Sequence, residues 1–196
     1  MTTKNRILDT KGRIRDTWRR SAQNVSVEDS ATAAAYVSWQ LALAATKNLH
    51  TEDFVYVDDH QRVSVLLEYL VFLAHVTDRL AYERMGAEER KRFVTSFVDA
   101  CAHHLQRNAE EILGSDDYRI QLIELLAARN HDYNQHPAHE GNPGYGLLRS
   151  FGGHVQKRMG TSQTNRWVMD QVITIDGPKA ADNLFQSIDR LLKSAA

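Results

Sequence analysis

Apolar and polar side chains follow helical spacing along most of the chain, and this pattern predicts an all-α protein. Apolar residues recur three and four positions apart, and no proline occurs before Pro137. We expect a single bundle-like domain, residues 1–196, of about seven to eight helices. The predicted helices span residues 4–20, 28–48, 58–85, 87–114, 115–135, 145–159, 163–175 and 178–194.

Local signals at the ends of these segments set the expected boundaries. Asp58 or Asp59 is suited to cap the third helix, and Gly86 is suited to end it in a left-handed conformation. Pro178 is expected at the first position of the last helix, where its missing N–H costs nothing. Residues 49–58 mix aromatic and β-branched types and predict a packed connector or a short strand.

A glycine- and proline-rich segment, residues 136–146, is the one candidate boundary within the chain. Its sequence HPAHEGNPGYG holds three glycines and two prolines in eleven residues. We expect it to separate a core of five helices from the C-terminal helices.

The segment near residues 60–85 is apolar in almost every direction around the helix, which predicts a buried central helix. Four polar side chains nevertheless share one side of it. At ~100° per residue, His75 falls about 20°, Tyr82 about 40° and Asp78 about 80° from the direction of Glu68. An unpartnered buried carboxylate costs several kcal/mol, so each of these residues implies a neighbour that donates or coordinates.

One hypothesis for this cluster is a buried hydrogen-bonded network that fixes the register of the helices. In this interpretation the protein is a ligand- or partner-binding domain with a polar inter-helical site around Glu68, His75 and Asp78. The expected members of the network are Glu68, His75, Asp78, Arg79, Tyr82 and Glu124.

The alternative hypothesis is a metal-dependent enzyme with a single-metal site between helices. His75 and Asp78, on adjacent turns, would supply two ligands, and His104 or His131 would supply another. Imidazole and carboxylate ligands together suit a divalent transition metal such as iron, manganese or zinc. The ferritin-like di-iron pattern is not met, because no Glu-x-x-His sequence occurs in the chain.

A second enzymatic alternative starts from the adjacent residues His131 and Asp132 and from His104, which lies 27 positions before His131. This spacing resembles the metal-binding pattern of HD-domain phosphohydrolases, which are also all-α. The resemblance implies a metal that activates water against a phosphate ester. The candidates for its last ligand are Asp170, Asp176 and Asp182. The chain departs from the family in the polar residues that flank the pair: Arg129, Asn130, Tyr133 and Asn134.

Charge and composition indicate neither nucleic acid nor membrane as a partner, because 24 Lys and Arg balance 25 Asp and Glu. The single cysteine, Cys101, and the absence of a secretion signal predict a cytoplasmic location. The predicted helix at 4–20 has an apolar face and a basic flank, and the last helix has a row of leucines. Both are candidates for docking a second copy of the chain, so a homodimer is one expectation.

Overall fold

The computed structural model describes residues 25–137, 142–162 and 164–195, and in this part of the chain it confirms the all-helical prediction. The predicted helix at 4–20 lies outside the described residues. The described chain forms six helices where seven were predicted within it, because the last two predicted helices are one. The elements are α2 (Val27–Thr51), α3 (Asp59–Arg84), α4 (Ala87–Leu113), α5 (Tyr118–Asn134), α6 (Gly144–Met159) and a final helix composed of α7 (Val168–Gln171), η1 (Val172–Asp176) and α8 (Gly177–Ala195).

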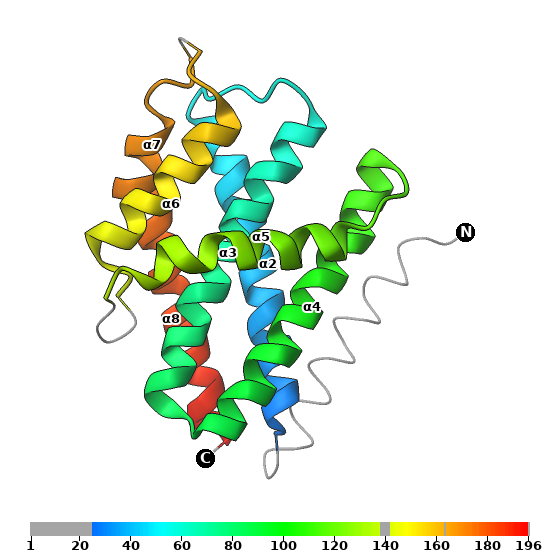
Figure 1. Ribbon diagram of the computed structural model, residues 1–196, viewed down its shortest axis with the longest axis vertical. Coiled ribbons are helices and arrows are strands. Elements are labelled where there is room, and N and C mark those ends of the chain that lie inside the picture. The colour runs from blue at the N-terminus through cyan, green and yellow to red at the C-terminus, as the bar shows by residue number, and fades with distance from the viewer. Residues whose placement is uncertain (1–24, 138–141, 163, 196) are drawn as a thin grey trace.

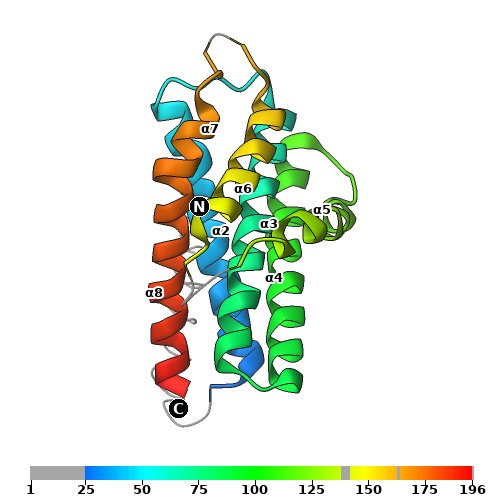
Figure 2. The same ribbon diagram turned by 60° about the vertical axis from the view of Figure 1, so that its left-hand side comes forward.

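The central helix is α3, as predicted. It packs against α2, α4, α5, α6 and α8, and its side chains from Val63 to Ala81 are buried with few interruptions. The helices α2, α3, α4 and α8 run along the long axis of the molecule (Figure 2). In contrast, α5 lies across α3 and α4 (Figure 1). This crossing limits the length of α3 that α5 can cover.

Helix boundaries follow the local signals at most positions. The side chain of Asp58 caps α3 by accepting a 2.7 Å hydrogen bond from the backbone N–H of Gln61. Residues 52–58 form a connector, and the described chain contains no strand. The expectation for Gly86 is wrong: its φ is −65°, and it precedes α4 as the N-cap while Met85 ends α3.

The predicted break at Pro178 is also wrong, because the chain continues as one helix through a π turn. A proline inside an α-helix has no N–H and its ring meets the carbonyl four residues earlier. In η1 the wider π turn changes this spacing, and the N–H of Gly177 bonds to the carbonyl of Val172, five residues before it. The helix therefore absorbs Pro178 without ending.

The apolar face of α8 is packed within the bundle. Leu184, Ile188 and Leu191 are buried, and α8 contacts α2 and α3. This face is therefore not free to receive a second copy of the chain, and the homodimer stays a prediction. None of the described helices combines the length and the apolar character needed to cross a bilayer.

Candidate functional site

Glu68 is fully buried on α3, and two arginines from other helices bind its carboxylate. Arg129 on α5 donates from Nε at 3.0 Å and from Nη2 at 2.7 Å, and Arg158 on α6 donates from Nε at 2.9 Å. Burial alone would raise the pKa of Glu68, but the hydrogen bonds and charges of the two arginines outweigh it and lower the pKa. The carboxylate is therefore ionised and ties three helices together.

His75 lies about two turns after Glu68 on α3 and is buried against an aromatic side chain. Its ring meets the ring of Tyr133 edge to face, with centroids 4.9 Å apart. Burial, reinforced by the charge of Arg79, lowers the pKa of His75 to about 4. The imidazole is therefore uncharged at neutral pH.

Asp78 and Arg79 have separate partners. Arg90 on α4 donates to both carboxylate oxygens of Asp78, at 2.8 and 2.6 Å. Arg79 donates to the backbone carbonyls of Tyr133 at 2.6 Å and His136 at 2.7 Å, at the C-terminal end of α5. Arg79 thus satisfies carbonyls that a helix end leaves without intrahelical partners.

The predicted members do not form one connected network: Glu68, Asp78 and Arg79 bond to different groups, and Nε2 of His75 has no hydrogen-bond partner in the described chain. Tyr82 and Glu124 lie apart from all of these contacts. Tyr82 is 70 % exposed, and its ring lies 5.0 Å from the guanidinium of Arg90. Glu124 is exposed on α5. The physical reason is the crossing of α5 (Figure 1), whose contacts with α3 run from Glu68 to Arg79. The three residues that end α3, residues 82–84, are exposed.

The four predicted metal ligands are not brought together. Asp78 pairs with Arg90, and His75 faces Tyr133. The ring of His104 lies 6.0 Å from Trp39 and 5.9 Å from Tyr36, whereas Nε2 of the exposed His131 lies 2.9 Å from the side-chain amide of Gln135. Within the described ranges, no three His, Cys, Asp or Glu side chains form a group that could hold a metal ion.

The ligand set implied by the resemblance to HD-domain phosphohydrolases is not assembled either. His131 faces solvent, and Oδ2 of the adjacent Asp132 lies 3.1 Å from Nε2 of His154. Among the candidates for the last ligand, Asp170 and Asp182 are exposed, and Asp176 is buried with a hydrogen bond from Asn48. The chain therefore has the sequence spacing of the HD-domain pattern, but its side chains do not converge on one site.

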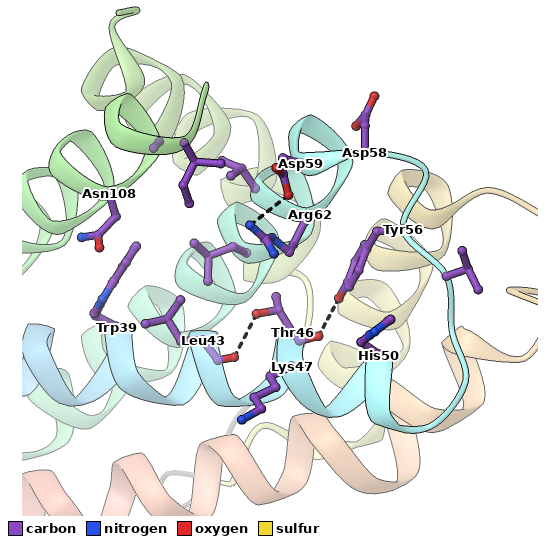
Figure 3. A pocket seen from close by; sticks show the side chains of 15 residues that line it. Trp39, Leu43, Thr46, Lys47, His50, Tyr56, Asp58, Asp59, Arg62 and Asn108 are labelled. Atoms are coloured by element: carbon purple, nitrogen blue, oxygen red, sulfur yellow. Dashed lines mark hydrogen bonds and ion pairs between the residues drawn. The ribbon is translucent and has the colours of Figure 1, made fainter. Parts of the chain in front are cut away.

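A cavity lies elsewhere, between α2, α3, α4 and the connector 52–58. Its volume is about 800 Å³. Figure 3 shows Trp39 and Leu43 from α2, Tyr56 from the connector and Arg62 from α3 around it. Its apolar lining is Trp39, Leu43, Val55, Tyr56, Val63, Leu66, Ala109 and Ile112.

Most polar groups of this cavity already have partners. The hydroxyl of Tyr56 donates to the carbonyl of Thr46 at 2.9 Å, and the hydroxyl of Thr46 donates to the carbonyls of Ala42 and Leu43. Arg62 pairs with Asp59 at 2.9 Å, and both side chains are about half exposed. Lys47 and His50 lie at the edge of the cavity, on the α2 face that also carries Leu43.

A second, shallower pocket of about 630 Å³ lies between the end of α5 and α6. Two polar pairs line it. Nε2 of His136 lies 2.8 Å from Oγ of Ser150, and Nε2 of His154 lies 3.1 Å from Oδ2 of Asp132. The exposed cations Arg149 and Lys157 also border it.

Sequence reasoning missed both pockets. The mixed aromatic and β-branched connector was the only signal near the first one. The loop 136–146 and Asp132 of the His131–Asp132 pair were the signals near the second. Comparison of the chain with protein-family models, with curated proteins and with solved structures gives no match. Function is therefore inferred from the geometry alone.

Proposed function

We propose that the protein binds an amphipathic small molecule, an apolar chain or ring that carries a carboxylate, in the cavity between α2, α3 and α4. The observation that carries the proposal is the cavity itself, about 800 Å³ in volume and lined mainly by apolar side chains. Small-molecule sites in proteins occupy roughly 300–1,000 Å³ and combine an apolar lining with a few polar groups. The cavity fits this description in both size and composition.

Apolar exposure around the mouth supports the same interpretation. Leu43, Val55 and Ile112 line the cavity, and they are 39 %, 49 % and 46 % exposed. A single exposed apolar residue is common on protein surfaces, but several around one cavity indicate a surface that a ligand covers. An apolar ligand would remove these three side chains from water together with its own surface.

Lys47 and Arg62 balance Asp58 and Asp59 around the cavity, and Arg62 is the group that favours an anionic ligand. Arg62 points toward the cavity, and Asp58 points away from it and caps α3 (Figure 3). The ion pair between Arg62 and Asp59 is half exposed, and such pairs contribute only about 0–1 kcal/mol, so Arg62 can exchange Asp59 for a ligand carboxylate at little cost. The N-terminus of α3 adds a positive dipole end beside Arg62.

Calorimetric titration of the full chain with decanoate tests the proposal, with decanol as an uncharged comparison. We expect saturable binding of decanoate that is tighter than binding of decanol. Arg62→Gln should weaken decanoate binding by roughly two- to fivefold, the worth of an exposed ion pair, and should leave decanol unaffected. Arg92→Gln is the matched control, because Arg92 forms an ion pair with Glu28 of similar length, 3.0 Å, and exposure.

A second variant tests the location of the site. Ala109 is 1 % exposed and lines the cavity, so Ala109→Leu places added methyl groups in the space that the ligand needs. We expect binding of both probes to weaken by roughly tenfold, a loss of about 1.4 kcal/mol, because the added atoms occupy volume that the ligand needs. Circular dichroism verifies that the variant is folded. Absence of saturable binding to the wild-type chain, or equal binding by the wild type and Ala109→Leu, would contradict the proposal.

A further inference from the structure

The pocket between α5 and α6 contains a serine and a histidine at hydrogen-bonding distance. This pair is not part of the cavity between α2, α3 and α4. We propose that Ser150 is a nucleophile that His136 activates, and that this pocket hydrolyses carboxylic esters that carry a second, anionic group. The proposal is independent of ligand binding in the cavity between α2, α3 and α4.

The distance between the two reacting groups meets the first requirement of nucleophilic catalysis. Nε2 of His136 lies 2.8 Å from Oγ of Ser150, within the 2.6–3.2 Å or so over which a base takes a proton from a hydroxyl. Both side chains are partly exposed in the pocket. A substrate can therefore reach the hydroxyl while the imidazole remains bonded to it.

Neighbouring groups fix the backbone of His136 and leave room for its imidazole. Arg79 donates to the backbone carbonyl of His136 at 2.7 Å, and the N–H of His136 donates to the carbonyl of Tyr133 at 3.2 Å. Gly146, one turn before Ser150 on α6, gives the ring room: a Cβ at this position would lie 2.7 Å from Nδ1 of His136. The ring therefore rests directly on the α6 backbone, which places Nε2 over Ser150.

A second polar pair forms the inner wall of the pocket. His154 lies one turn after Ser150 on the same face of α6, is only 6 % exposed, and has Nδ1 without a hydrogen-bond partner in the described chain. Its Nε2 faces the carboxylate of Asp132. A buried imidazole nitrogen without a partner, such as Nδ1 of His154, is costly unless a polar ligand or water meets it.

The charges at the rim define the substrate class. Arg149 and Lys157 both border the pocket, and Lys157 lies two turns after Ser150. Cationic side chains near a reacting carbonyl stabilise the negative charge that develops on its oxygen. One of these two cations can stabilise the carbonyl oxygen while the other binds a carboxylate elsewhere in the substrate. This arrangement favours anionic esters over neutral ones.

The reaction proceeds in two steps, acylation of Ser150 and hydrolysis of the acyl-serine. Oγ of Ser150 attacks the ester carbonyl carbon and its proton passes to Nε2 of His136; the tetrahedral intermediate then breaks its bond to the alkoxide, which takes this proton and leaves as the alcohol. Water then attacks the acyl-serine and gives one proton to His136. The second intermediate expels Oγ of Ser150, which recovers the proton, and the carboxylic acid leaves.

Labelling with a fluorophosphonate probe, followed by mass spectrometry of the peptides, tests the nucleophile directly. We expect the probe to label Ser150 in the wild-type chain. The label at this site should be absent in Ser150→Ala and lowered roughly 100-fold in rate in His136→Gln, the usual worth of a general base. Ser187 is the internal control, because it is a partly exposed helical serine that bonds only to a backbone carbonyl.

Two further measurements distinguish catalysis from nonspecific reactivity. Hydrolysis of 4-nitrophenyl succinate should exceed hydrolysis of 4-nitrophenyl acetate, and Lys157→Gln should reduce this preference. Gly146→Ala retains both reacting groups but displaces the imidazole, so the labelling rate should fall while thermal unfolding shows a folded protein. Labelling of Ser150 no faster than Ser187, or unchanged labelling in His136→Gln, would overturn the proposal.

Discussion

Asn48, in the last turn of α2, donates a hydrogen bond of 2.8 Å from Nδ2 to Oδ1 of Asp176, the last residue of the π turn. The contact joins residues 128 positions apart and holds the final helix against α2. Asp176 is 4 % exposed, and its Oδ2 has no hydrogen-bond partner in the described part of the chain. A buried carboxylate with so few partners makes this contact energetically important.

The first prediction concerns the amide of this pair. Asn48→Ala should lower the free energy of unfolding by about 1–3 kcal/mol, because the variant removes one of the two side chains, Asn48 and Gln171, that donate to a buried carboxylate. Chemical denaturation at neutral pH measures the change. Asn134→Ala is the control, since the Asn134 side chain makes a 2.8 Å hydrogen bond that is exposed to solvent. Equal losses in the two variants would contradict the assigned role of Asn48.

The second prediction concerns pH and Asp176. Burial raises the pKa of this carboxyl above its ordinary value of 3.8, although the hydrogen bonds of Asn48 and Gln171 partly oppose burial. The folded chain therefore binds this proton more tightly than the unfolded chain, and the contribution of Asp176 to stability falls as pH rises above 3.8. Asp176→Asn should gain stability relative to the wild type between pH 3 and pH 7, as denaturation at both pH values would measure. A stability difference between Asp176→Asn and the wild type that is the same at pH 3 and pH 7 would contradict this prediction.

The third prediction ranks the two arginines that bind Glu68. The Arg129 side chain is 18 % exposed and donates two hydrogen bonds to Glu68, whereas the Arg158 side chain is 38 % exposed and donates one. Arg129→Met should therefore cost roughly 3–5 kcal/mol of unfolding free energy, as for a broken buried ion pair. Arg158→Met should cost about 1.5 kcal/mol, the loss of one charged hydrogen bond. Urea denaturation gives both values, and the reverse order would be inconsistent with the contacts.

The fourth prediction gives Glu68 a pH dependence of opposite sign to that of Asp176. The two arginines hold the pKa of Glu68 below its ordinary value of 4.5 despite burial. Its stabilising contribution is thus present above pH 4.5 and is lost as pH falls through the lower folded value. Glu68→Gln should be less stable than the wild type at pH 7, and the difference should shrink toward pH 3. If the Glu68→Gln and Asp176→Asn differences move in the same direction with pH, one assignment is wrong.

The contrast between these two carboxylates indicates what the sequence can predict. Periodicity and local caps such as Asp58 place the helices, and the all-round apolar character of α3 predicts that Glu68 is buried. The partners of Glu68 could not be predicted, because Arg129 and Arg158 lie 61 and 90 residues away. Angular spacing on one helix does not define which other helix covers that face.

Long-range packing also accounts for the other errors. The break predicted at Pro178 follows a local rule, but the final helix gains more by continuing along α2 and α3. Tyr82 lies only about 40° from the direction of Glu68 on α3, yet the contacts of α5 with α3 run from Glu68 to Arg79 and Tyr82 is exposed. Cavities are the feature that is hardest to predict from sequence, because they arise where side chains from several elements do not fill the space between them.

The fifth prediction uses adjacent glycines on α6 as a matched pair. A Cβ on Gly152 would lie 2.8 Å from Cγ1 of Ile173 and 3.2 Å from the backbone carbonyl of Met169, so α6 packs on the final helix at this position. A Cβ on Gly153 would meet no atom within 4 Å. Gly153→Ala should therefore raise the free energy of unfolding by about 0.5–1 kcal/mol, the usual gain of replacing a helical glycine by alanine.

Gly152→Ala should show the opposite effect. The same helix-propensity gain applies, but the added methyl group must push η1 away from α6, at a cost of about 1–3 kcal/mol. Thermal and urea denaturation of the two variants, measured side by side, separate the terms because the substitution, the helix and the solvent conditions are identical. Stabilisation by Gly152→Ala equal to that of Gly153→Ala would mean that α6 and the π turn do not pack as closely as described, and the placement of Ile173 against α6 would have to be abandoned.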